Sequence, residues 1–208
     1  MLTGSTNLLL MQRVSETLAG RARRLMRAAA LRIGGLVNQA ELGRDTAIPR
    51  PTVHRYLNLL EASFQLVRLE PYSVNRTKRL IKTPKLYWSD TALAMHLAGN
   101  PEPAGAHLEN FVLADLLAWR DAQIPHPGVL YWRTATDLEV DFVIEHHGRL
   151  LPIEVKATGR PSTDDLRGIV AFRDEYPDLF LGGLVLHGGD EIQWLSDRIA
   201  GVPWHRVV

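Results

Sequence analysis

The first half of the chain carries its apolar residues mainly at helical spacing. Residues 22–37, ARRLMRAAALRIGGLV, form one amphipathic pattern, and NQAELGRD follows with Asn38 in place to cap a second, short helix. Pro49 and Pro51 suit the start of another helix, in which apolar residues recur at helical spacing through VHRYLNLLEAS. The pattern therefore predicts helices, of which the last two are arranged as a helix-turn-helix.

A strand pair is predicted directly after these helices. Phe64 to Glu70 alternates between apolar and polar residues, SVNRTKR has the composition of a turn, and LIKTPKLYW returns as a second strand. A hairpin that follows a recognition helix is typical of a winged helix, so residues 22–100 are predicted to form a winged-helix domain. Ser89-Asp90 precedes TALAMHLAG and is predicted to cap a further helix.

The second half of the chain predicts a mixed domain. The segment AGNPEPAGAH, residues 98–107, breaks any periodic pattern and marks the start of a second domain, residues 101–208. GAHLENFVLADLLAWR predicts an amphipathic helix. GVLYWRT, LEVDFVIEHH and RLLPIEVKAT predict three strands, STDDLRGIVAFRDEY a helix, and LFLGGLVLHGG a buried strand. The expected order is α-β-β-β-α-β, in an α+β or α/β fold.

The charge distribution separates the same two parts. Residues 1–100 carry a balance of +9 and residues 101–208 a balance of −8, which together give the net charge of +1. The basic part favours a polyanionic partner such as DNA. The chain has no cysteine, which excludes disulfides and thiolate metal sites, and no run is long and apolar enough to span a bilayer. A cytoplasmic, soluble protein is expected.

Polar positions on the predicted recognition helix are the candidates for contact with DNA. Side chains at these positions can reach phosphates and base edges in a major groove, and basic residues at the tip of the wing can follow the phosphate backbone. The candidates on the helix are Arg50, Thr52, His54, Arg55 and Asn58, and those on the wing are Arg76, Lys78 and Arg79. The alternative is a winged helix that contacts protein, with these residues merely solvated.

Two predicted strands carry charges where a core strand would not. Glu139 and Asp141 lie two apart in the first, and Glu154 and Lys156 lie two apart in the second. Because side chains two apart in a strand share a face, these groups are expected to project from adjacent strands towards one place. The alternative is that Glu154 and Lys156 form an ordinary ion pair.

These charges and the element order resemble the PD-(D/E)XK nuclease superfamily. The matching residues are Glu109 in the first helix, Asp141, and EVK, Glu154 to Lys156. The resemblance implies that Asp141 and Glu154 hold Mg²⁺ or Mn²⁺, that Lys156 stabilises developing charge, and that Glu109 assists the metal or its water. Glu139 is a supporting candidate. A nuclease-like fold that binds without cutting, and serves DNA binding, protein contact or regulation, stays open.

The chain also resembles the C-terminal part of bacterial and archaeal AAA+ family ATPases. The resemblance rests on LTGSTNLLLM…SETLAGR, RPTVHRYLNLLEA, KTPKLYWSDTAL, GAHLENFVLADLL and EVDFVIE…LLPIEVKAT. Residues 1–21 look like the end of an ATPase domain, but the phosphate-binding loop G-x-x-x-x-G-K-[ST] is absent, so no ATP binding is expected. Oligomeric state is not fixed by the sequence, and a homo-oligomer or a protein partner stays open.

Overall fold

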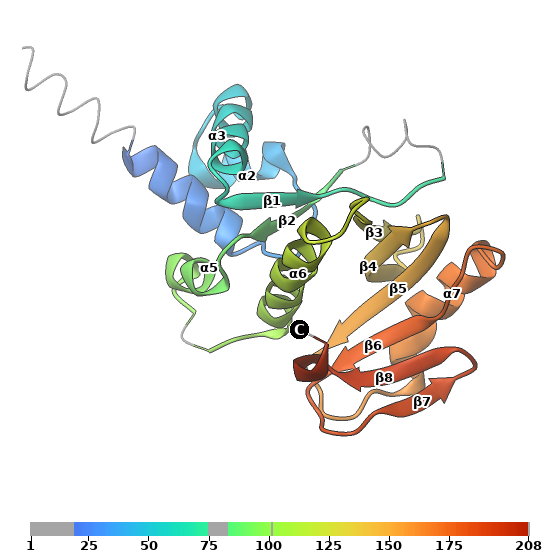
Figure 1. The fold of residues 1–208 in the computed structure, drawn as a ribbon. Helices are drawn as coiled ribbons and strands as arrows, with labels where there is room; N and C mark the ends of the chain where they lie inside the picture. The colour runs from blue at the N-terminus through green and yellow to red at the C-terminus, as the bar shows by residue number, and fades with distance from the viewer. Residues whose placement is uncertain (1–18, 75–82, 101, 208) are drawn as a thin grey trace, which may run out of the picture.

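The computed structural model describes residues 19–74, 83–100 and 102–207 as an α+β protein in two parts (Figure 1). The prediction for residues 1–21 falls almost entirely outside these ranges. In Figure 1 the N-terminal helices and a short hairpin form one part, and a large sheet forms the other, with helix α6 (Gly105–Asp121) between them. No helix within the described ranges has the length and apolar character needed to cross a membrane.

The N-terminal part contains helices around one hydrophobic core. A helix covers residues 19–30, followed by α2 (Gln39–Thr46) and α3 (Arg50–Ala62). Asn38 caps α2 as predicted, since its side chain accepts a hydrogen bond from Glu41 N. The core of this part contains Leu25, Leu42, Val53, Leu57 and Trp88.

The first helix is shorter than the pattern over residues 22–37 predicts. It ends at residue 30, and Gly34 adopts a positive φ of 76°, a conformation that glycine reaches without steric cost. Gly34 N then donates to Leu86 O at 2.8 Å, and Leu36 forms a single antiparallel bridge to Lys85. The prediction was wrong here because the glycine pair lets the chain leave the helix and run beside a strand.

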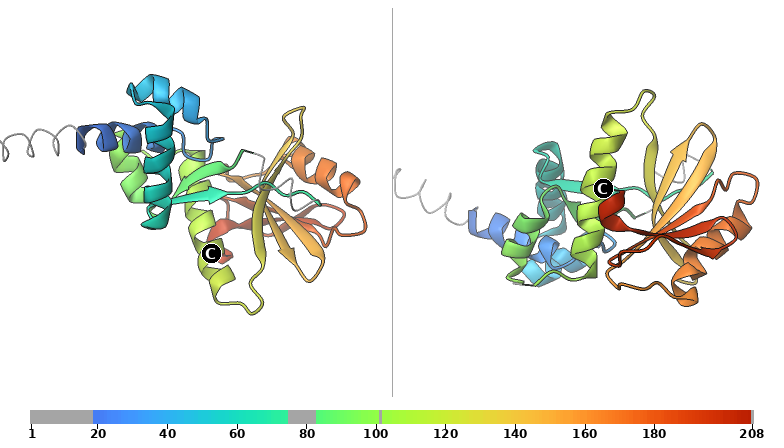
Figure 2. Two further views of the ribbon diagram at one scale, coloured as in Figure 1. Left: turned by 90° about the horizontal axis from the view of Figure 1, so that it is seen from above. Right: turned by 60° about the horizontal axis from the view of Figure 1, so that its bottom comes forward.

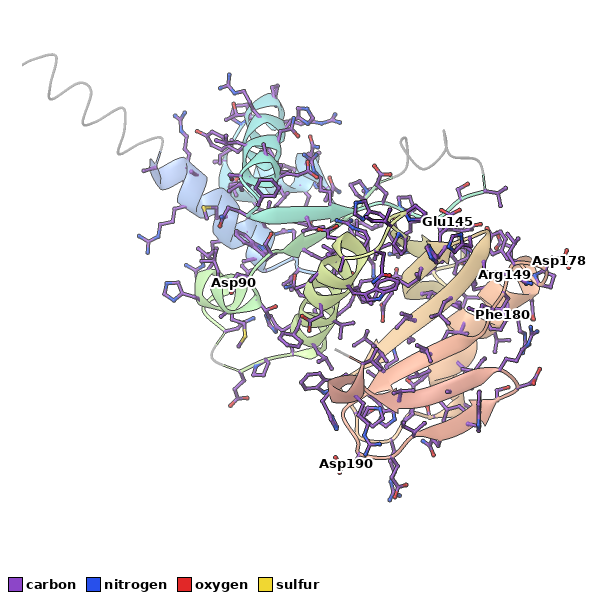
Figure 3. All side chains as sticks on the ribbon, in the orientation of Figure 1. Asp90, Glu145, Arg149, Asp178, Phe180 and Asp190 are labelled. Atoms are coloured by element: carbon purple, nitrogen blue, oxygen red, sulfur yellow. The ribbon has the colours of Figure 1, made fainter. Side chains whose placement is uncertain are left out.

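A two-stranded antiparallel sheet follows α3, as predicted. It pairs β1 (Leu66–Leu69) with β2 (Lys85–Trp88), and α5 (Thr91–Ala98) comes next. Asp90, labelled in Figure 3, caps α5 by accepting a hydrogen bond from Leu93 N at 2.9 Å. The predicted turn with Arg76, Lys78 and Arg79 lies outside the described residues.

The C-terminal part is a six-stranded mixed sheet with a helix against each face (Figure 2). Its elements are α6 (Gly105–Asp121), β3 (Gly128–Arg133), β4 (Glu139–His146), β5 (Arg149–Lys156), η1 (Thr163–Leu166), α7 (Arg167–Glu175), β6 (Gly183–His187), β7 (Gln193–Ser196), β8 (Ile199–Pro203) and η2 (Trp204–Arg206). The order is β3-β4-β5-β6-β8-β7, with β5, β6 and β8 mutually parallel and the remaining pairs antiparallel. The predicted order from α6 to β6 is confirmed, whereas β7 and β8 were not predicted.

Helix α6 joins the two parts through a buried asparagine. Asn110 is fully buried; its Oδ1 accepts from Trp88 N at 2.7 Å, and its Nδ2 donates to Trp88 O at 2.9 Å and to Thr91 Oγ1 at 2.7 Å. A second link runs from the end of β1, where Pro71 pairs with Tyr131 of β3. The two parts are therefore linked at the end of β2, through the Asn110 side chain, and after the end of β1, through the Pro71 bridge.

Candidate functional site

Asp141 and Glu154 lie where strands β4 and β5 separate. The antiparallel register of these strands ends at Phe142 opposite Ile153, immediately before the two acids. The pairing of β3 with β4 is also irregular here, since Leu130 pairs with Val143 but Trp132 pairs with Val140. Such bulges re-aim side chains. Asp141 Oδ2 accepts a hydrogen bond from Val155 N at 2.9 Å, so its side chain reaches β5.

The alternation rule suggests that the pair Glu139 and Asp141 and the pair Glu154 and Lys156 share one face of the sheet. In the structure they do not. Ile153 and Val155 belong to the core beneath α6, so alternation places Glu154 and Lys156 towards the α7 face. Glu139 and Asp141 instead approach Lys85 on the N-terminal part. The two pairs meet at the open end of the β4–β5 ladder, because Asp141 reaches over to the β5 backbone.

Glu109, from α6, points into the same region. Its Oε1 accepts a hydrogen bond from Lys85 Nζ at 3.1 Å and another from the Tyr87 hydroxyl. Burial, and then repulsion from Asp141, raises the pKa of Glu109 to about 7. Burial also raises the pKa of Asp141, against the opposing effects of Lys85 and the Val155 N–H. The carboxylates of α6 and β4 are therefore close enough to influence each other's ionisation.

Lys85 is the site residue that the sequence analysis missed. Its side chain is only 3% exposed, and its Nζ lies 3.1 Å from Glu109 Oε1, 2.5 Å from Glu139 Oε1 and 3.7 Å from Asp141 Oδ1. Burial alone would lower the pKa of Lys85, but attraction from these three carboxylates outweighs it and raises that pKa above the usual lysine value. The signal in the sequence was a lysine at the start of an apolar strand, PKLYW.

Glu154 keeps one carboxylate oxygen without a partner. Its Oε1 accepts from Lys156 Nζ at 2.8 Å, so the ion pair that the sequence offered as the alternative interpretation does form. Its Oε2 is buried and has no hydrogen-bond partner among the described residues. Burial, and then repulsion from Asp141, raises the pKa of Glu154 to about 8. A buried oxygen left unpaired is costly unless another group binds it.

A hard divalent cation at this place would need free carboxylate oxygens. Glu154 Oε2 is unpaired, and Asp141 Oδ1 is 3.7 Å from Lys85, beyond hydrogen-bond distance. By donor chemistry these two residues therefore fit Mg²⁺ or Mn²⁺. Across residues 19–74, 83–100 and 102–207, however, no three His, Asp or Glu side chains already stand together as a ready set of metal ligands. The Lys85 ammonium, which comes from the N-terminal part, faces the acidic cluster formed by Glu109, Glu139 and Asp141.

The burial of Glu154 predicts a pH-dependent stability. Its pKa is about 8 in the folded protein against an ordinary value of 4.5, so folding favours the protonated form. The favourable contribution is complete below about pH 4.5 and is lost as pH rises towards 8. Glu154→Gln is expected to melt roughly 5 °C above the wild type at pH 8 without divalent ions, and close to it at pH 5. Thermal denaturation followed by circular dichroism measures this.

Replacement of an exposed carboxylate, Glu191→Gln, is the control for that comparison. It removes one charge of the same type at the surface, so its melting temperature should follow the wild-type curve at both values of pH. If the melting temperatures of Glu154→Gln and the wild type differed by the same amount at pH 5 and pH 8, burial would not raise the pKa of Glu154.

The predicted DNA-contact positions on α3 are mostly exposed, with Thr52 half-buried: Arg50, Thr52, His54, Arg55 and Asn58. Asn58 is already engaged, since its Oδ1 accepts from Arg68 Nη2 at 2.6 Å and its Nδ2 lies 3.1 Å from His54 Nε2. Arg68 is held in turn by Glu61. Arg50 and Arg55 are therefore the exposed basic side chains of α3 that can contact DNA. Asn58 is held in a fixed orientation by its hydrogen bonds.

Comparison with known proteins finds relatives but no established activity. Residues 104–207 match the family model "Domain of unknown function (DUF4143)", and residues 11–104 match "Domain of unknown function (DUF8612)". Two uncharacterized proteins, from Mycobacterium bovis and Mycobacterium tuberculosis, are each 34% identical over 185 residues. These matches cover 84% of this chain but only 40% of either relative, so the chain spans about two fifths of their length. No solved structure matches.

Proposed function

The chain belongs to the DUF4143 family, whose domain is found in the C-terminal region of AAA-ATPase-like proteins, and on that premise we propose that it binds DNA and carries a divalent-metal-dependent nuclease-type site. The observation that carries the proposal is that Asp141 lies near both Glu109 and Glu154, and that Lys156 pairs with Glu154, at the open end of the β4–β5 ladder. The reaction class is hydrolysis of a phosphodiester bond.

The order of the strands supports a PD-(D/E)XK fold. A helix, an antiparallel β3-β4-β5 meander, a second helix and a strand parallel to β5 follow one another along the chain. In that superfamily the acids and the lysine come from the second and third strands, which are β4 and β5 here. The additional strands β7 and β8 extend the sheet beyond β6, at the edge away from the site.

The N-terminal part supports a winged helix. Its order is a helix, the bridge residue Leu36, α2, α3, β1 and β2. Leu36 pairs with Lys85 as a short third strand would. In this arrangement α3 is the recognition helix.

Each residue of the site has a distinct role in this proposal. Asp141 and Glu154 would hold Mg²⁺ or Mn²⁺, which supplies Lewis acidity and lowers the pKa of a bound water. Lys156, which is about one third exposed, would contact the scissile phosphate and offset its developing negative charge. Glu109, with its raised pKa, can accept or return a proton near neutral pH.

Cleavage is the direct test of this function. Wild-type protein with Mn²⁺ or Mg²⁺ is expected to cut supercoiled or branched DNA, whereas Asp141→Asn and Lys156→Met should lose at least ~100-fold of the rate. EDTA should abolish cleavage by the wild type. Cleavage by Asp141→Asn at the wild-type rate would contradict the assignment of Asp141 to the site.

DNA binding is tested separately from cleavage. Arg50→Ala/Arg55→Ala is expected to weaken binding to all duplex sequences and to flatten the dependence of log Kd on log salt by up to about two, because each arginine releases phosphate counterions. Fluorescence anisotropy with EDTA present measures this.

The matched control for binding is Arg120→Ala/Arg173→Ala, which removes two arginines from α6 and α7. Each of these pairs with the neighbouring aspartate, so affinity and salt slope should be retained. An unchanged affinity in the α3 variant would exclude this helix as the DNA contact.

A second candidate is a non-cleaving module that uses the nuclease-like fold for DNA binding, protein contact or regulation. The observation that favours it is Lys85, which already neutralises the carboxylates that face the N-terminal part. In that case the wild type would bind DNA without cutting it under any divalent ion.

A further inference from the structure

Lys85 comes from a different part of the protein than the acids it contacts. It lies on β2 of the N-terminal part, whereas Glu109 lies on α6, and Glu139 and Asp141 lie on β4. The neighbouring Tyr87 also reaches from β2 to Glu109. The strand is further tied by Leu36, which bridges to Lys85. One lysine thus joins the hairpin to two elements of the site.

A bound cation would compete with the Lys85 ammonium for the Asp141 carboxylate. Its Nζ is 3.7 Å from Asp141 Oδ1 and 3.1 Å from Glu109 Oε1. Asp141 uses its other oxygen for the backbone of β5, so Oδ1 is the oxygen left for any cation. A dication on that oxygen would lie within a few ångströms of the ammonium, in a region where burial leaves charges poorly screened.

The two cations therefore cannot both occupy this part of the cluster at low cost. Three carboxylates without a positive charge would also be costly, because like charges repel in a poorly hydrated place. Asp141 Oδ1, the oxygen that the two cations would share, is consequently neutralised either by the lysine or by a metal. Glu139 is also paired with Arg133 at 3.1 Å, so it retains a partner if the lysine leaves.

We propose that Lys85 and a divalent cation are alternative counterions of the acidic cluster, so that metal loading displaces the Lys85 ammonium and loosens β2 from α6 and β4. This inference rests on the proposed metal site, and it names the regulation of that site. Displacement would couple metal occupancy to the attachment of the hairpin that precedes α5, and hence to the position of the N-terminal part.

The test compares Mn²⁺ affinity in the wild type, Lys85→Met and Arg133→Met, measured by calorimetric titration of the full chain. Lys85→Met is expected to bind Mn²⁺ about tenfold more tightly than the wild type, because the competing charge is gone. Arg133→Met removes a positive charge from the rim of the same cluster but none that faces Asp141. Its affinity should stay within about threefold of the wild type.

A second readout needs no variant and guards against poor folding of Lys85→Met. An amine-reactive acetylating reagent, read by mass spectrometry, should label Lys85 slowly in metal-free wild type, where its side chain is 3% exposed. Mn²⁺ should accelerate that labelling several-fold, while Lys156, which is already about one third exposed, gains less.

The outcomes separate this inference from the proposed function. Tighter binding in Lys85→Met, or Mn²⁺-accelerated labelling of Lys85, supports displacement. Wild-type Mn²⁺ binding with no gain in Lys85→Met and no change in labelling overturns the competition and leaves the metal site standing. No Mn²⁺ binding in the wild type and in Lys85→Met overturns both, and leaves Lys85 as the permanent counterion of an inert cluster.

Discussion

Gly168→Ala is expected to destabilise the protein by more than about 4 kcal/mol, because helix α7 packs against β4 without room for a methyl group. A Cβ at position 168 would lie 1.9 Å from the carbonyl oxygen of Glu139 and 3.0 Å from its carbonyl carbon. Both are backbone atoms, so relief requires movement of the helix or the strand. Since Glu139 also contacts Lys85, the same movement would disturb the acidic cluster. Urea denaturation followed by circular dichroism measures the loss.

Gly105→Ala is the matched control for that substitution. It lies in the first turn of α6, and a Cβ there meets no atom within 4 Å. Its stability should equal or slightly exceed that of the wild type, since alanine is the better helix former. A Gly168→Ala variant within about 1 kcal/mol of the wild type would show that α7 and β4 are not packed as described.

Asn110→Ala is expected to cost about 3–5 kcal/mol of stability. The change removes three hydrogen bonds and leaves the buried N–H and C=O of Trp88 without the partners they have in the folded protein. Trp88 belongs to the N-terminal core and Asn110 to α6. The substitution should therefore weaken the contact between the two parts of the protein most. The measurement is urea denaturation, with limited proteolysis to locate the weakened region.

Asn58→Ala is the control, since Asn58 is an exposed asparagine on α3 with hydrogen bonds only to side chains. It should cost less than about 1 kcal/mol. Equal effects of the two asparagine substitutions would contradict a special role for the buried one.

Most local elements of the fold could be predicted because their signals are local. The caps Asn38 and Asp90 each place a side-chain oxygen before a helix that begins at the expected residue. The end of the first helix was not predicted, since the tertiary pairing of Gly34 and Leu36 with β2 overrides helical periodicity. Strand β7 escaped prediction because it is short and mostly exposed, with Trp194 78% exposed.

The four motif residues could be placed on the correct elements, but their arrangement could not be derived from alternation. The irregular pairing near Tyr131 turns Asp141 relative to its strand neighbours, and a bulge of this kind leaves no mark in a pattern of apolar residues. Lys85 could not be predicted as a partner, because it is 24 residues from Glu109 and on another part of the protein. Contacts of this range depend on the tertiary fold.

The most direct test of the metal site is the melting temperature of the wild type, Asp141→Asn and Glu154→Gln, each with EDTA and with millimolar Mn²⁺. A ligand that binds only the folded state raises its stability, and Asp141 and Glu154 carry the oxygens that fit the ion. Mn²⁺ is expected to raise the melting temperature of the wild type by several degrees, and both variants should lose this rise. Identical melting temperatures for the wild type with and without Mn²⁺ would contradict the metal site and the nuclease function that rests on it.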